Sequence, residues 1–210
     1  MKKALFILLC LGVVFSAQAQ FTQSGNSSKK NSGNANTVDV RGFNKVYAFY
    51  SPASLKASGS SLDGSQFGVA YTRSQCLARV PLYLEFGGGF EYTSFSDIDL
   101  KLYSVNVPVN ITYRFSFSGG KMHLAPYTGP FFRFNVAGNV AGETDIFKLF
   151  KRFQFGWQEG VAFNVRAFYV SLAYAHDFSD LEDTSKMKEL VGQSISNKIS
   201  GFHIGLGVVF

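Results

Sequence analysis

The sequence predicts an all-β fold, namely an eight-stranded antiparallel up-and-down transmembrane β-barrel. Four observations favour this fold. Apolar and polar residues alternate over stretches longer than the roughly five or six residues of a usual globular strand. Long and short connections alternate between these stretches, and the chain begins with a secretory leader. The 23 phenylalanines and 10 tyrosines also require apolar surroundings for many rings.

The first residues have the pattern of a signal peptide. Lys2 and Lys3 precede an apolar run over residues 4–15, which is followed by the small-x-small triplet Ala17-Gln18-Ala19. The run is too short to cross a membrane and leads into this cleavage site. The next segment is rich in Ser, Asn and Gly and cannot bury enough apolar surface to fold. We therefore expect a signal peptide at 1–19, a flexible polar tail at 20–37 and an outer-membrane β-barrel domain at 38–210.

Charge and cysteine content argue against several classes of protein. The formal net charge is +6, but the basic residues are scattered, so no nucleic-acid surface is predicted. Cys76 is the only cysteine outside the leader, which leaves no intramolecular disulfide. The 3 histidines lie far apart and do not have a metal-binding spacing, and no cofactor motif is present.

The longest alternation covers residues 101–117. Its odd positions are apolar from Tyr103 to Phe117, with aromatic residues at both ends and aliphatic residues between them, and its even positions are mostly polar. A β-strand sends alternate side chains to opposite faces, so one face suits hydrocarbon and the other suits water or polar partners. A tilted membrane-spanning strand needs about nine to eleven residues, and this segment is long enough.

Other segments show the same pattern with varying regularity. The first has the least regular alternation, and we expect its Tyr47 and Phe49 to point outward. The fifth is weak at its start, because Pro126 and Pro130 interrupt any regular ladder. The strand candidates, in chain order, are residues 43–51, 66–73, 82–92, 101–117, 123–136, 153–165, 168–178 and 198–210.

The connections between these segments alternate in length. External loops and periplasmic turns alternate in this way in an up-and-down barrel, and an even number of strands places both termini at the periplasmic end. Long polar connections are expected at 52–65, 93–99, 137–152 and 179–197, and shorter ones at 74–81, 118–122 and 166–167.

The volume of the lumen decides which face points outward. Side chains just fill the interior of an eight-stranded barrel. The polar face is dominated by Gly, Ala, Ser, Asn and Thr, whereas the apolar face carries too many large residues for all of them to point inward. An outward apolar band with aromatic rims indicates contact with lipid. The alternative is a soluble lipocalin-like barrel, which would show the same alternation.

The chain ends on a strand that closes with Phe210, which looks like the terminal signal by which barrel-assembly machinery recognises outer-membrane barrels. Other motifs are Val107-Pro108-Val109, Pro126-Tyr127-Thr128-Gly129-Pro130, Gly160-Val161-Ala162-Phe163, the segment from Tyr174 to Asp180 and the terminal Gly-x-Gly-x-x-Phe. On these motifs the chain resembles small outer-membrane β-barrel proteins of the PorT-like, porin-family type. The resemblance covers the chain after the tail and implies a bacterial outer-membrane location and an eight-stranded barrel. It implies no mechanism, since most members have no assigned activity and PorT itself is linked to protein secretion.

The lumen is expected to hold a charge network of Glu85, Glu91, Arg114 and Arg133. Unpaired charge is costly in a dry interior, so these residues should pair with one another and with polar neighbours. We interpret the network as a plug that makes the barrel rigid. The alternative is a narrow porin-like channel for small solutes or ions.

A candidate catalytic set is His176, Asp177 and Ser179, because some eight-stranded barrels are enzymes that act on lipid A. A lipid A deacylase places its His and Ser two residues apart on one face of a strand, whereas His176 and Ser179 are three apart and should diverge. We therefore expect no catalytic site, and a lipid-modifying enzyme is the weaker alternative. Glu159 is an exception to the pattern, because strict alternation puts its charge on the lipid-facing side.

The expected function is structural or interaction-bearing, as an adhesion or scaffold protein of the outer membrane. Its outer loops, especially 52–65 and 179–197, are expected to contact ligands or other proteins. The expected partners are outer-membrane lipid and the barrel-assembly machinery, with no nucleic acid.

Overall fold

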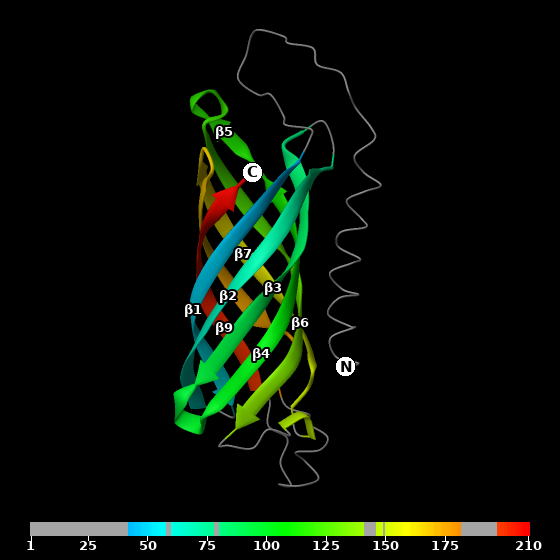
Figure 1. Cartoon of the computed structure of the whole chain (residues 1–210), viewed down its shortest axis with the longest axis vertical. Coiled ribbons are helices and arrows are strands. Elements are labelled where there is room, and N and C mark those ends of the chain that lie inside the picture. Colours follow the sequence, from blue (N-terminus) through cyan, green and yellow to red (C-terminus); the bar gives the residue numbers. More distant parts are fainter. Residues whose placement is uncertain (1–41, 58–59, 78–79, 141–145, 149, 182–196) are drawn as a thin grey trace. The chain divides into compact units, whose positions relative to one another are not determined.

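The computed structural model describes residues 42–57, 60–77, 80–140, 146–148, 150–181 and 197–210 (Figure 1). The expected signal peptide and polar tail lie outside these residues. Within the described ranges, no helix is long and apolar enough to cross a membrane.

The described strands form one antiparallel sheet that closes on itself (Figure 1). The strands are β1 (Phe43–Ala57), β2 (Ser60–Cys76), β3 (Leu82–Phe95), β4 (Leu100–Tyr113), β5 (Phe115–Phe117), β6 (Met122–Val140), β7 (Phe153–Val165), β8 (Phe168–Asp177) and β9 (Asn197–Val209). Short 3-10 turns are η1 (Ser96–Ile98), η2 (Ser118–Gly120) and η3 (Ile146–Lys148). β4 and β5 form one stave that is interrupted at Arg114, because both pair with β6. The 9-stranded sheet is therefore an eight-stave barrel, and the predicted fold is confirmed.

The barrel closes where the first strand meets the last. In the pairing of β1 with β9, Lys45 lies opposite Val209. The seam continues past the end of β9, because the backbone N–H of Asn44 donates to the carbonyl of Phe210 at 2.8 Å and the N–H of Phe210 donates back at 2.9 Å. Apart from a break at Ser51 and Pro52, this ladder runs along the seam and closes the sheet, as a membrane barrel requires.

The prediction of a long loop at 52–65 is wrong. β1 and β2 remain paired in a continuous register that runs as far as Ala57 opposite Ser60. The cause is a change in the side-chain pattern, since the apolar residues Ala53, Leu55 and Leu62 pack toward the inside of the barrel there. The end of this hairpin therefore lacks the outward apolar row from which the other strands were predicted.

The prolines disturb β6 less than predicted. β6 pairs with β7 without a break from Met122 to Phe134, through both Pro126 and Pro130. On its other side, the ladder to β4 has a gap that includes Pro130, which fits its missing N–H donor.

Side chains alternate between lumen and exterior as predicted on β2 to β4 and on β6 to β9. The expectation for β1 is wrong. Tyr47 and Phe49 line the lumen, whereas Val46 and Tyr50 are 42% and 52% exposed. Aromatic residues occupy both faces of β1, so size does not distinguish them. Lys45 distinguishes the two faces, because it is buried and therefore places the odd-numbered residues of β1 in the lumen.

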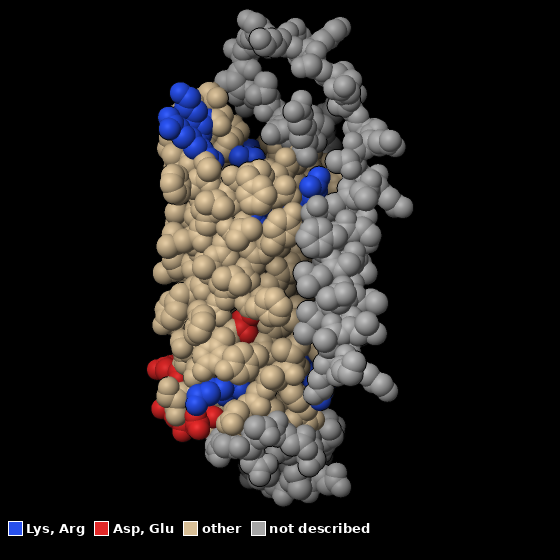
Figure 2. Space-filling model, in the orientation of Figure 1, with Lys and Arg blue, Asp and Glu red and all other residues tan. Residues whose placement is uncertain are grey.

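The outward surface of the barrel is apolar over a broad band. Phe90, Leu172 and Leu206 are 56%, 51% and 60% exposed. On the face drawn in Figure 2, uncharged residues cover almost all of the middle of the barrel, and charged residues gather toward its two ends. This surface fits a hydrocarbon solvent better than water.

The polarity of the two faces reverses at the end of the barrel that carries the long connections, where inward side chains are apolar and outward side chains are polar. The interior there holds a buried apolar cluster, which we call the collar core: Ala53, Leu55, Phe95, Leu100, Leu102, Ile146, Leu181 and Ile199. Outward neighbours such as Asp63, Lys101 and Lys198 are polar and exposed. A strand with an apolar inside and a polar outside is built for water.

Outward aromatic residues lie where the two patterns meet. Phe67, Tyr92 and Tyr103 are register partners on β2, β3 and β4, and each neighbouring pair of rings is 5.0 Å apart. Aromatic girdles of this kind sit at membrane interfaces. We call the strand ends beyond this row the collar.

Candidate functional site

The lumen contains two layers of buried charge, and the first lies toward the short turns. This turn-side layer is centred on Lys45, whose ammonium group is 2.7 Å from a carboxylate oxygen of Glu85. The Ser74 hydroxyl donates to the same carboxylate at 3.1 Å, and the Asn110 amide is at 3.5 Å. Lys45 Nζ also lies 4.5 Å from the centre of the Tyr169 ring. Both charges therefore have several partners although they are out of contact with water.

The second layer lies toward the collar and is centred on Arg133. Its Nε is 2.7 Å from Glu91, and its Nη1 is 2.7 Å and 3.0 Å from the two carboxylate oxygens of Asp177. This collar-side layer joins β3, β6 and β8 across the lumen. Further donors to Glu91 are Gln66 at 3.3 Å, Asn106 at 3.1 Å and Thr93 at 3.4 Å.

Three of the predicted lumen residues lie in these two layers. Glu91 and Arg133 are brought together as an ion pair, whereas Glu85 pairs with Lys45 instead of with a predicted arginine. Lys45 was not among the predicted lumen residues, because the opposite face of β1 was expected to point inward.

Arg114 lies apart from the other predicted residues. It stands at the interruption between β4 and β5, where its backbone N–H donates to the carbonyl of Pro81 at 2.8 Å. Its guanidinium carbon lies 4.4 Å from the centre of the Phe43 ring. Arg114 is only half-buried, so it belongs to the turn end of the barrel and not to the lumen layers.

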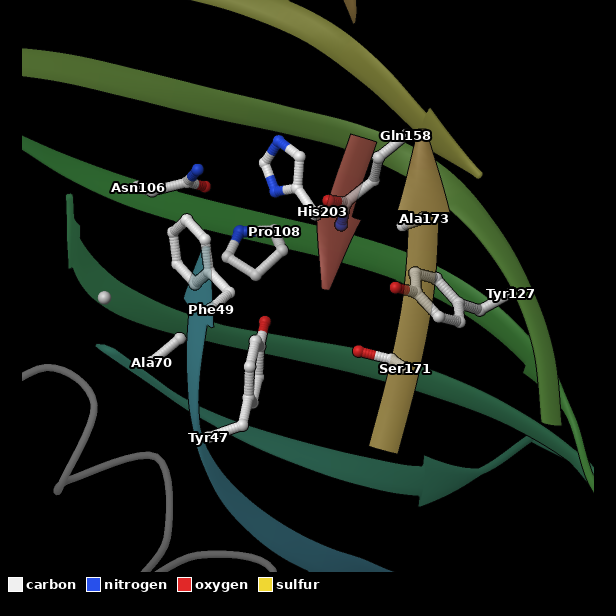
Figure 3. Close-up of a pocket in the computed structure, with 11 residues that line it drawn as sticks. Tyr47, Phe49, Ala70, Asn106, Pro108, Tyr127, Gln158, Ser171, Ala173 and His203 are labelled. Atoms are coloured by element: carbon white, nitrogen blue, oxygen red, sulfur yellow. The ribbon is translucent and has the colours of Figure 1, made fainter. Parts of the chain in front are cut away.

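A small cavity of about 30 Å³ lies among the lumen side chains. Figure 3 shows Tyr47, Tyr127 and His203 directed toward it from different strands. The His203 ring stacks on Phe49, with ring centres 5.3 Å apart. A cavity of this size holds about two water-sized groups, so it is too small for an organic ligand.

The candidate catalytic residues are separated in the structure. The His176 ring faces outward between the rings of Tyr174 and Phe178, at centre distances of 5.9 Å and 4.9 Å. Asp177 faces inward to Arg133, and the Ser179 hydroxyl accepts a hydrogen bond from a backbone N–H on β7 at 2.9 Å. Within the described ranges, no three His, Cys, Asp or Glu side chains form a group that could hold a metal ion.

Glu159 points outward from the middle of β7 and is exposed, which confirms its predicted position. It lies opposite Thr128 on β6 and Tyr174 on β8, with no bulge in either ladder. The neighbouring Trp157 indole N–H donates to the Thr128 hydroxyl at 2.8 Å. Among the described residues, no hydrogen bond or ion pair is found for the Glu159 carboxylate.

Phe210 and Cys76 lie at the turn end. The Phe210 ring is 65% exposed, while its backbone completes the seam with β1. Its role as an assembly signal stays a prediction. Cys76 ends β2, where its Sγ lies 3.5 Å from the carbonyl of Val80.

Comparisons with known proteins show the fold. No protein-family model and no curated protein matches the chain. The crystal structure of Neisserial surface protein A superposes with a TM-score of 0.53 at 16% identity, covering 79% of this chain and 96% of the Neisserial chain. Ail, the attachment invasion locus protein of Yersinia pestis, gives 0.47 at 14% identity, covering 80% and 99% of the two chains. The outer membrane enzyme PagL gives 0.49 at 12% identity, covering 76% and 98%. The likeness to the Neisserial protein supports the closed barrel.

Replacement of Arg133 tests the collar-side layer. Arg133→Met should lower the free energy of unfolding by about 3–5 kcal/mol, because Glu91 and Asp177 would stay buried without their cation. The measurement is urea unfolding of the barrel in lipid vesicles. The control is Arg114→Met, which removes a half-buried arginine outside both layers and should cost clearly less. Equal losses in the two variants would contradict a central role for this layer.

Replacement of Glu159 tests its outward position in lipid. Glu159→Leu should raise the free energy of unfolding by about 1–2 kcal/mol, because a lipid-facing charge is removed. Gln158→Leu is the matched control, since Gln158 faces the lumen and donates to Asn110 at 2.9 Å, and it should destabilise. Loss of stability in Glu159→Leu would instead show that the carboxylate has a favourable partner in the membrane.

Proposed function

We propose that the protein is an outer-membrane barrel with a closed lumen, whose role is adhesion or scaffolding through its collar and outer loops. The observation that supports this best is the filling of the lumen by two ion-paired layers and the collar core. A plugged barrel has its accessible chemistry on the outside. The function therefore depends on what the two ends and the outer wall contact.

Several features support an outer-membrane location. The outward apolar band is bordered by aromatic rings, and the sequence has the pattern of a secretory leader and a terminal Phe210. Outer-membrane lipid and the barrel-assembly machinery are the corresponding partners. Kinship with PorT-like barrels is part of the same proposal, and the likeness to a Neisserial surface protein is in accord with it.

The collar is the part of the barrel best suited to contact partners. Its inside is an apolar core, so the strand ends keep their shape beyond the aromatic row. Its outside carries exposed charges of both signs, such as Asp63, Asp97 and Lys101. The segments 137–152 and 179–197 start from this end, and the parts of them outside the described residues are extra candidate contact surfaces. A rigid collar of this kind can hold the loops in place while its apolar core keeps the lumen closed.

Conductance distinguishes the plug from a channel. Purified protein in planar lipid bilayers should give no single-channel steps, because Arg133 is held from two sides across the lumen. Regular conductance steps in the wild type that become larger in Arg133→Ala would contradict the closed lumen and support the narrow channel instead.

Attachment assays test the role of the collar. Cells that produce the wild type should adhere to surfaces coated with matrix proteins better than cells without it. The double variant Asp63→Lys and Asp97→Lys reverses collar charges and should lose at least half of this gain, because both residues are exposed. Ser118→Lys, which adds a positive charge at the exposed other end, is the control and should keep it. Equal attachment of all strains would contradict an adhesion role.

A further inference from the structure

The two ends of the barrel differ in charge. The described charged residues of the turn end are Arg73, Arg114, Lys121, Arg166 and the buried pair Lys45 and Glu85. Exposed acidic residues, such as Asp63 and Asp97, lie at the collar end. On the face drawn in Figure 2, the end that bears β5 shows Lys and Arg but no Asp or Glu among its described residues.

Two exposed cations of the turn end are held next to each other by the backbone. Lys121 follows η2, and Arg166 begins the short connection between β7 and β8. The backbone N–H of Arg166 donates to the carbonyl of Lys121 at 2.8 Å. Met122 and Val165 are register partners directly above this bond. The two turns therefore form one rigid unit with two cationic side chains.

This unit lies at the edge of the outward apolar band. Phe117, Phe168 and Val165 flank the two cations in sequence and are 49%, 72% and 38% exposed. Cations beside exposed rings at a strand end meet a membrane at the depth of the lipid phosphates. Acyl chains of the same lipid could lie along the rings.

Arg166 occupies a backbone conformation that favours other residues. Its φ is 53°, in the left-handed region where Gly and Asn are the relaxed choices. An arginine at such a position is conformationally unfavourable, and strained positions of this kind gather at functional sites.

We propose that Lys121 and Arg166 bind the phosphate group of an anionic phospholipid in the periplasm-facing leaflet. The proposal rests on the proposed function, since it needs the barrel in the outer membrane with its short turns toward the periplasm. The guanidinium of Arg166 can grip two phosphate oxygens, and Lys121 supplies a second positive charge. Among the described side chains of this end the one carboxylate is Glu85, which is buried with Lys45. The terminal carboxylate of Phe210 accepts the backbone N–H of Asn44 at 2.8 Å.

Lipid titration tests this site. The full mature chain in mild detergent is titrated with phosphatidylglycerol, and bound lipid is counted by native mass spectrometry. We expect tighter binding of phosphatidylglycerol than of phosphatidylcholine, and about fivefold weaker binding for each lost cation in Lys121→Gln and Arg166→Asn. Lys101→Gln at the collar, where the lysine pairs with Asp99 at 2.9 Å, is the control and should bind like the wild type.

Arg166→Asn distinguishes a loss of lipid binding from a loss of folding. Asparagine tolerates the left-handed conformation better than arginine, so this variant should be at least as stable as the wild type while it binds less lipid. Equal lipid binding by all variants, or no preference for phosphatidylglycerol, would overturn the proposal. Glycerol phosphate that competes as well as the whole lipid would show a site for free phosphate and would overturn the lipid assignment.

A labelling experiment separates this proposal from the proposed function. In a Cys76→Ser background, a cysteine introduced at Ser118 should resist a membrane-impermeant maleimide in intact cells, whereas one at Asp97 should react, since both positions are exposed. The reverse result would overturn the orientation, and with it the leaflet assigned to the lipid. Loss of phosphatidylglycerol preference with correct labelling would overturn the lipid site alone.

Discussion

The structure depends on the requirement that every charge inside a narrow barrel finds a partner. Arg133 meets it by bridging Glu91 on β3 and Asp177 on β8, with both oxygen contacts at 2.7 Å. Side chains fill the lumen of an eight-stave barrel, so water cannot stabilise a stray charge there. The bridge also fixes three strands relative to one another across the lumen. Lys45 and Glu85 form a second ion pair at the other level, and a cavity of about 30 Å³ lies among the described lumen side chains.

The collar follows from the opposite requirement. Beyond the aromatic row the surroundings change from hydrocarbon to water, so the strands must exchange their polar and apolar faces to stay folded. The buried Leu55, Leu100 and Leu102 show that they do so while β1 stays in register with β2 and β3 with β4. Between β4 and β6 the register shifts at Tyr103 and Ser104, at the level of the aromatic row. One continuous sheet thus combines a membrane barrel with a short water-exposed barrel.

Regular alternation made most of the fold predictable. β4 and β7 have regular alternating patterns. The alternation on the neighbouring strands β3 and β6 predicted that Glu91 and Arg133 point inward. The pairing of Arg133 with Asp177 did not follow, because Asp177 lies on β8, which is separated from β6 by β7, and the two side chains meet over that intervening strand. Lys45 was missed because aromatic residues occupy both faces of β1. The collar was mistaken for a loop because its apolar residues face inward, contrary to the rule that identified the other strands.

The exchange of faces at the aromatic row has a consequence for how the barrel sits in a bilayer. Sliding outward would pull Phe67 and Tyr103 into water, and sliding inward would push Asp63 and Lys101 into hydrocarbon. Both displacements raise the energy, so the bilayer depth is recorded in the strands themselves. The aromatic row and the collar therefore fix the depth of this end of the barrel, and the bilayer surface has to follow them locally.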